Sequence, residues 1–193
     1  MNQCSSCVLF SVLILPLIPF QCALFEHLNV AASQLHPNSG AMVRAFKILC
    51  PFFNIRPCMS VFVFFFQMKL IGKIGWVSLK NMSKKLFEFD SNVFCHFKDR
   101  FIKILATDVV TDGLLLMFHK DGEPYFLFYW QFDPTRFKSF DEYLLTLLKR
   151  VDKDILEQLS ASLDARAILS LSSTSNPLAA LDDKVPNLVL FCV

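Results

Sequence analysis

The run Val61–Leu70 constrains the fold of this chain more than any other segment. It spans ten residues and is apolar on every side, so it has to be buried whichever backbone conformation it takes. Periodicity cannot distinguish a buried helix from a buried strand in such a run. Ten residues are long for a strand, and the sequence therefore predicts a buried helix. An aromatic platform for stacking nucleic-acid bases is the alternative, but no charge is interleaved among the aromatic residues Phe62–Phe66, which favours a place in the core.

The overall composition predicts one folded domain. The chain has 193 residues, of which 54% are hydrophobic and 19% charged, a balance that excludes intrinsic disorder over most of the length. Its 22 phenylalanines are many for the interior of a domain this size. We therefore expect part of the apolar surface to lie at a partner interface, and the isolated chain to be poorly soluble.

Two helices are predicted near the N-terminus. Apolar residues recur every four positions over Phe20–Leu28, which is typical of one buried helical face. The His36–Pro37 pair favours a turn, so His36 is interpreted as a structural turn residue, and Asn38 or Ser39 is expected to cap a second helix. Pro51 is expected to end that helix, because proline breaks the intrahelical hydrogen-bond ladder.

Short strands are predicted in the middle of the chain. Trp76–Leu79 and Leu86–Phe89 flank a lysine-rich turn and predict a hairpin. A second hairpin is expected over Gly113–Trp130, because Asp121–Gly122 suits a turn whose central residues need positive φ. Together these segments predict a mainly antiparallel central sheet over about 75–131.

A helix is predicted over residues 140–159. It is preceded by the capping box Ser139–Glu142, and a short helical stretch Ser162–Leu171 is expected after it. The long helix is amphipathic, and we expect it to pack on the sheet, with self-association as the alternative. The fold class is therefore α+β: N-terminal helices, a central mainly antiparallel sheet and a C-terminal amphipathic helix. The expected buried stripe consists of Leu144, Leu148, Val151, Ile155 and Leu159, and the expected outer residues are mainly Lys149, Arg150, Lys153 and Glu157.

Four sequence blocks, in this order, resemble the plant domain family of gypsy-type transposases. The resemblance covers roughly residues 15–180, and the family occurs in proteins derived from retrotransposons. It implies a lineage and a gag-like structural role rather than a reaction, and no activity is carried over to particular residues. The blocks are Leu28–Ser39, Gly75–Leu79, Phe97–Phe101 and Asp121–Trp130.

The resemblance suggests a division of the chain. We expect a divergent apolar segment over residues 1–14, a gypsy-type transposase-like domain over 15–171 and an irregular tail over 172–193. The apolar run Val8–Leu15 raises the alternative of a signal peptide or membrane anchor. Against it, no Lys or Arg precedes the run, and Pro16 and Pro19 interrupt the longer candidate segment Cys7–Phe25. An intracellular location, in the nucleus or the cytoplasm, is expected, with the membrane or secretory pathway as the alternative.

Positive charge is concentrated in the first part of the chain. Residues 1–105 carry 11 Lys/Arg against 4 Asp/Glu, whereas residues 106–193 carry 8 against 13. Clustered positive charge attracts phosphate, although lysines near strand ends also serve as solvated residues that protect sheet edges. Non-specific nucleic acid is therefore an expected partner of a basic patch. That patch comprises Lys69, Lys73, Lys80, Lys84, Lys85, Lys98, Arg100 and Lys103.

The cysteines indicate reduced, buried thiols inside a cell. There are seven, an odd number at irregular spacing, which does not suit a disulfide framework. Cys4–x–x–Cys7 is the only metal-like pair and has no second pair or nearby histidine. Cys95–His96 are adjacent, which places them on opposite faces of a strand. We therefore predict no metal and no other cofactor.

No catalytic constellation is complete. Asp121 and Glu157 have 35 intervening residues, as in integrases, but no acidic residue lies between Glu26 and Glu88, and metal-dependent strand transfer needs a third carboxylate. The sequence favours a non-enzymatic, retrotransposon-derived structural or interaction protein that self-associates through apolar surface and helix 140–159. A membrane-anchored or secreted protein and a metal-dependent nuclease are the alternatives.

Overall fold

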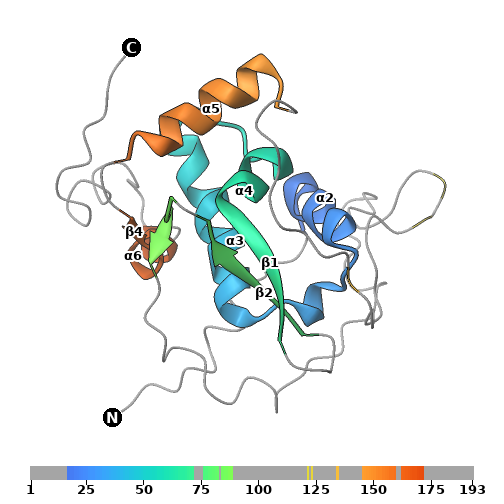
Figure 1. Cartoon of the computed structure of the whole chain (residues 1–193). Helices are drawn as coiled ribbons and strands as arrows, with labels where there is room; N and C mark the ends of the chain where they lie inside the picture. The colour runs from blue at the N-terminus through green and yellow to red at the C-terminus, as the bar shows by residue number, and fades with distance from the viewer. Residues whose placement is uncertain are drawn as a thin grey trace, which may run out of the picture. The chain divides into compact units, whose positions relative to one another are not determined.

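The computed structural model describes residues 17–71, 76–82, 84–88, 121, 123, 134, 145–159 and 162–171, and it confirms the α+β class (Figure 1). The chain forms two compact units. The first comprises Met1–Gly40, Met68–Lys80 and Ser91–Lys138, and the second comprises Ala41–Gln67, Asn81–Asp90 and Ser139–Val193. The predicted domain boundaries after residues 14 and 171 stay predictions, because the segments beyond them lie outside the described residues.

The first unit begins with helix α2, Pro19–Leu28. Proline occupies its first turn, where the missing N–H costs nothing. Phe20, Leu24 and Leu28 are buried, which confirms the predicted helix and its apolar face. The helix ends at Asn29, whose φ of 51° lies in the left-handed region, a conformation that asparagine tolerates better than most residues.

A short 3₁₀ turn, η1 (Ala32–Gln34), leads into helix α3, Pro37–Leu49. Nδ1 of His36 accepts a hydrogen bond from the backbone N–H of Asn38 at 3.2 Å, and the His36 carbonyl accepts one from the N–H of Ser39 at 2.8 Å. His36 is thus the structural turn residue that the sequence predicts. The predicted cap at Asn38 or Ser39 is wrong, because both residues already lie within the helix and His36 supplies the capping atom.

The run Val61–Leu70 does not form one buried helix. Helix α4 spans Met59–Phe65, and strand β1 spans Phe66–Ile71. Phe66 has the extended angles φ −131° and ψ 145°, and β1 pairs with β2, Trp76–Asn81, in a two-stranded sheet. The predicted helix is therefore correct only for the first half of the run. Strand β2, the next strand along the chain, offers the second half backbone hydrogen bonds, and the periodicity of the run itself does not report such a partner.

Strand β2 is anchored to the start of α3 within the first unit. The backbone N–H of His36 donates to the Val77 carbonyl at 2.7 Å. The Ser39 hydroxyl oxygen accepts a hydrogen bond from the Leu79 N–H, also at 2.7 Å, and this contact is buried. The serine expected to cap α3 instead satisfies a backbone donor of a strand 40 residues away in the sequence.

We expect Ser39→Ala to lower the free energy of unfolding by about 1–3 kcal/mol, because it leaves the buried Leu79 N–H without its acceptor. The matched control is Ser78→Ala on the same sheet, where an exposed hydroxyl makes a longer hydrogen bond of 3.4 Å to the Lys69 carbonyl. Urea unfolding followed by circular dichroism measures both variants. Equal, small losses for the two serines would contradict a structural role for the Ser39 contact.

An aromatic core holds the second unit together. Phe62 of α4 lies edge-to-face with Phe46 of α3, at 5.2 Å between ring centroids, and stacks on Phe66 at 4.5 Å. Phe66 in turn stacks on Phe87 at 6.1 Å. All four rings are fully buried. They bring together segments that are far apart in the sequence, and such offset or edge-to-face arrangements are those that aromatic pairs prefer.

Two very short strands complete this unit. Strand β3, Phe87–Glu88, pairs in parallel with β4, Leu163–Asp164. The predicted hairpin between Trp76–Leu79 and Leu86–Phe89 is therefore wrong, because β2 pairs with β1 and β3 pairs with a strand near the C-terminal end. Helix α6, Ala165–Leu171, follows β4.

Helix α5 is shorter than predicted. It spans Leu147–Glu157, and Thr146, with ψ 161°, is its non-helical N-cap. The described helix thus begins at Leu147, and the predicted capping box Ser139–Glu142 lies outside the described residues. The predicted hairpin Gly113–Trp130 also lies outside them, except for Asp121 in a turn and Glu123.

Candidate functional site

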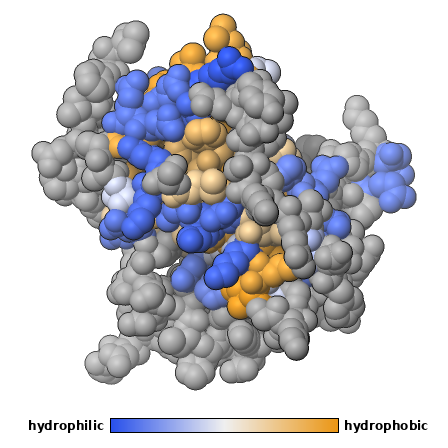
Figure 2. Space-filling view, in the orientation of Figure 1, coloured by the Kyte–Doolittle hydropathy of each residue, from blue (hydrophilic) through white to orange (hydrophobic). Residues whose placement is uncertain are grey.

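Helix α5 exposes its apolar residues instead of burying them. Leu147 is 76% exposed, Leu148 78% and Val151 50%. Ile155, four residues after Val151 and therefore on the same side of the helix, is half-buried. We call these four residues the α5 apolar face. Figure 2 shows hydrophobic residues at the top of the molecule, where α5 lies in Figure 1.

The opposite side of α5 docks onto α4 through one leucine and one lysine. Leu156 is fully buried, and Lys153 is only 4% exposed. The Lys153 ammonium lies 5.0 Å from the centroid of the Phe64 ring on α4, within the range of a cation–π interaction. Helix α5 therefore packs on α4 through the aliphatic stem of Lys153, and the leucine-rich side of α5 remains exposed.

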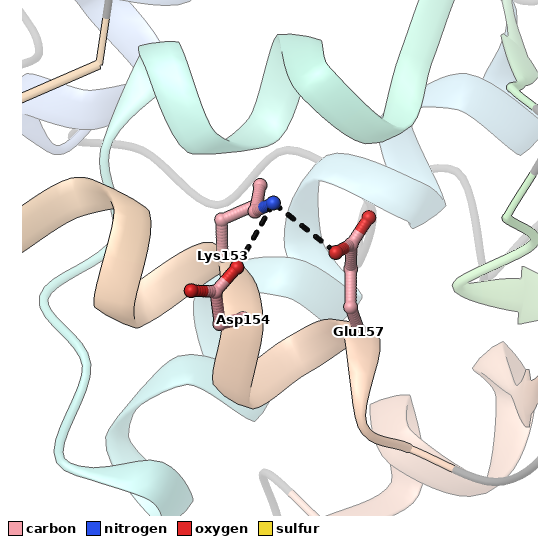
Figure 3. Close-up of polar contacts among 3 residues, drawn as sticks. All are labelled: Lys153, Asp154 and Glu157. Carbon is pink, nitrogen blue, oxygen red and sulfur yellow. Dashed lines mark ion pairs between the residues drawn. The ribbon is translucent and has the colours of Figure 1, made fainter. Parts of the chain in front are cut away.

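Two carboxylates neutralise the buried charge. The Lys153 Nζ lies 2.9 Å from Asp154 Oδ1 and 3.2 Å from Glu157 Oε2, and the close-up in Figure 3 shows both ion pairs. A buried ammonium is costly unless it is paired. Glu157, four residues along the helix, and the more exposed Asp154 supply this pairing.

Lys84 contacts Leu159, the second residue after the end of α5. Its ammonium donates a hydrogen bond to the Leu159 carbonyl at 2.8 Å. A positive charge after the last helical turn also complements the helix dipole. Lys84, predicted to face nucleic acid, thus already has a structural contact.

The predicted orientation of α5 is wrong. The sequence predicts Leu148 and Val151 inside and Lys153 outside, and the structure has the reverse. The amphipathic pattern correctly indicates which residues share a side of the helix. It does not indicate which side a neighbouring segment covers. That choice depends on the contact between Phe64 and Lys153, for which the sequence carries no signal.

The structure describes half of the predicted basic patch. Lys69 on β1 and Lys80 on β2 are exposed and belong to the same two-stranded sheet. Lys85 is exposed in the loop before β3. Lys73, Lys98, Arg100 and Lys103 lie outside the described residues. A nucleic-acid contact by these residues stays a prediction.

The two carboxylates with integrase-like spacing have other contacts. The Asp121 carboxylate accepts a hydrogen bond from the Glu123 N–H at 3.1 Å, which is typical of an aspartate in a turn. Glu157 is ion-paired with Lys153. Within the part of the chain that the structure describes, no three His, Cys, Asp or Glu side chains are placed to hold a metal ion.

The described cysteines are free thiols. Cys22 and Cys50 are buried, as predicted, and Cys58 is half-buried. Burial raises the pKa of Cys22 to about 11. The pKa of Cys50 is also raised, first by burial and then by the nearby Cys58 and Asp152. Both thiols are therefore protonated at neutral pH, and a protonated thiol is a poor nucleophile or metal ligand. Cys4, Cys7, Cys95 and His96 lie outside the described residues.

The N-terminal apolar region is described only from residue 17 onward. There it forms α2, a helix of 10 residues. Among the described helices, none combines the length and the apolar character that crossing a bilayer requires.

A family model matches the N-terminal part of the chain. Residues 4–70 match the family model described as "Putative gypsy type transposon", which confirms the resemblance predicted from the sequence. The match includes the block Leu28–Ser39 and begins before residue 15, and the three later blocks lie beyond it. No curated protein and no solved structure matches the chain. Over residues 4–70 the chain is therefore similar to proteins of gypsy-type transposons.

Proposed function

We propose that this chain is a non-enzymatic, retrotransposon-derived structural protein that works by associating with further copies of itself. The α5 apolar face carries this proposal. Three large apolar side chains on one side of one helix, each at least half exposed, form a surface of the kind that marks an interaction site. The transposon-related family match supports the lineage, and the incomplete catalytic constellations support a structural role.

Self-association is the expected use of this face for a physical reason. Burying a leucine side chain against an apolar partner contributes about 1.5–3 kcal/mol. In a symmetric dimer each residue is buried twice. Leu147, Leu148 and Val151 therefore offer enough apolar surface to hold two copies together at micromolar concentrations, provided that the faces meet.

We expect the wild-type chain to be a dimer or larger species at tens of micromolar by size-exclusion chromatography with light scattering. Leu148→Ser should weaken this association at least about tenfold, because each dimer loses two buried leucines. Leu148 is on the exposed side of α5, so the fold should survive the change. Phe52→Ser, on the half-buried side of η2 (Cys50–Phe53), is the control outside α5. A wild-type chain that stays monomeric at this concentration would rule out the proposal.

Weak nucleic-acid contact is a second proposed activity, and the exposed lysines Lys69 and Lys80 on one sheet favour it. Non-specific binding of this kind has a dissociation constant of about 1–100 μM and weakens steeply with salt.

The proposed location is intracellular, in the nucleus or cytoplasm. Fractionation of a C-terminally tagged chain tests it, and carbonate-resistant membrane association would overturn it.

We expect Lys69→Gln with Lys80→Gln to reduce the slope of log affinity against log salt concentration by about 1–2, one unit for each lost phosphate contact. Fluorescence anisotropy with a labelled single-stranded oligonucleotide measures this slope. Lys84→Gln is the control, because Lys84 is already bonded to the Leu159 carbonyl and should change stability rather than the salt slope. Salt-independent binding, or none at low salt, would contradict a phosphate contact.

A further inference from the structure

We infer that the His36 turn, residues 35–40, is a pH-sensitive contact between the start of α3 and strand β2, which is closed while the imidazole is neutral and opens when the ring takes up a proton. The His36 N–H donates to the Val77 carbonyl at 2.7 Å, and the His36 carbonyl accepts hydrogen bonds from the N–H groups of Ser39 at 2.8 Å and Gly40 at 3.0 Å. The side-chain Nδ1 accepts a further one from the Asn38 N–H at 3.2 Å. Residues 35–40 belong neither to the α5 apolar face nor to the basic patch, so this contact goes beyond the proposed function.

Only the neutral ring can make the side-chain contact. A ring nitrogen that accepts a hydrogen bond carries no proton, so the neutral imidazole of His36 has its proton on Nε2. In the imidazolium both nitrogens are donors, and the Nδ1–H would then face the Asn38 N–H, a second donor. Protonation therefore leaves the Asn38 N–H, one of the first N–H groups of α3, without this acceptor.

The charges around the turn also favour the neutral ring. The first N–H groups of α3 form the positive end of the helix dipole, a position that can hold an imidazole in its neutral form. The two elements that bind the turn carry only cations, Arg44 and Lys47 on α3 and Lys80 on β2, and they contain no Asp or Glu. Before the turn, η1 has no charged residue, and the nearest ionisable residues in the sequence are Glu26 and His27 of α2.

Opening of the turn would reach β2 as well. Leu35 forms a parallel bridge with Val77, and the Ser39 hydroxyl accepts the buried hydrogen bond from the Leu79 N–H at 2.7 Å. These contacts come from residues on both sides of His36, so a movement of its ring and backbone disturbs them together. We therefore expect acid to loosen the first turn of α3 and β2 at the same time, whereas α4, which contains no titrating residue, stays closed.

Acid should destabilise the folded chain through this residue. The unfolded chain binds a proton at His36 at about pH 6.5, whereas the folded turn resists it, so this stability is full above that pH and is lost as the pH falls below it. Asparagine can still cap a helix and does not titrate. Between about pH 7.5 and about pH 5, we expect the unfolding constant of the wild-type chain to rise about three- to tenfold more than that of His36→Asn, which corresponds to one hydrogen bond.

Urea unfolding followed by circular dichroism at both pH values compares the two chains. Burial lowers the pKa of His27, so that residue also destabilises the folded chain in acid, but it does so in both chains and cancels. His27→Gln is the matched control, and it should keep the acid-dependent loss that His36→Asn removes. An equal rise of the unfolding constant in the wild-type and His36→Asn chains, or a larger rise in the variant, would overturn the inference.

Hydrogen exchange decides the question if His36→Asn does not fold. In the wild-type chain, we compare the protection of the amides of residues 38–40 and Leu79 with that of α4, after correction for the intrinsic pH dependence of exchange. This ratio should fall about three- to tenfold between the same two pH values, and a constant ratio would overturn the inference. A wild-type chain that stays monomeric would overturn the proposed self-association and leave the His36 contact standing.

Discussion

Replacing Phe62 with alanine is expected to lower the free energy of unfolding by about 3–5 kcal/mol. Phe62 is fully buried and contacts the rings of both Phe46 and Phe66. Its removal leaves a cavity between α3, α4 and β1 and breaks two aromatic contacts, each worth about 0.5–1.5 kcal/mol. A typical domain has a free energy of unfolding of about 5–15 kcal/mol, so this variant would lose a large share of its stability.

Urea unfolding followed by circular dichroism measures this loss. We expect the urea concentration at the midpoint to fall, while the slope of the unfolding free energy against urea concentration stays unchanged. Phe62→Leu keeps most of the volume and should cost about 1–2 kcal/mol. Phe52→Ala, at a half-buried position in η2, should cost about 1 kcal/mol. If Phe62→Ala proved as mild as Phe52→Ala, the stacked rings would not form the core of the second unit.

Reversing the buried charge at Lys153 is the second large expected effect. Lys153→Glu would place a third carboxylate beside those of Asp154 and Glu157, which now lie 2.9 and 3.2 Å from the ammonium. It would also remove the cation from the Phe64 ring. An uncompensated charge at a buried site destabilises by about 3–5 kcal/mol, so we expect α5 to detach from α4 or the unit to unfold.

Lys153→Met is the matched variant. Methionine keeps the aliphatic stem over Phe64 and introduces no charge. The two carboxylates that lose their partner have side chains that are 56% and 36% exposed, so water can solvate them and no uncompensated charge stays buried. We expect a change within about 1 kcal/mol, by the same urea measurement. A large loss for Lys153→Met would mean that the ion pairs, rather than the packing of the stem, hold α5 in place. Equal, small effects of Glu and Met would show that the side chain is not buried.

The sequence predicts well the elements that depend on neighbouring residues. Helix α2 follows from the apolar spacing over Phe20–Leu28 and from Pro19, and α3 ends before Pro51 because proline cannot continue a helix. The aspartate turn at Asp121 follows from the same kind of local chemistry. In each case the atoms that decide the conformation lie within one helical turn or one tight turn.

The errors concern contacts with segments outside the predicted element, whether near in the sequence, as for β1 and β2, or far, as for β3 and β4. The run Val61–Leu70 changes from helix to strand at Phe66 because β2 supplies hydrogen-bond partners. Strand β3 pairs with β4, some 75 residues further along the chain, rather than with its neighbour β2. Both alternatives satisfy the same local propensities, so the choice depends on packing that only the folded chain provides.

The candidate site divides in the same way. The sequence by itself determined that Leu148, Val151 and Ile155 share one side of a helix, because 3.6 residues per turn is a property of the backbone. Only the tertiary structure decided that this side faces outward, because the docking of α5 depends on what α4 presents to it. There the Lys153 ammonium lies over the Phe64 ring and Leu156 is buried, so the leucine-rich side of α5 remains exposed.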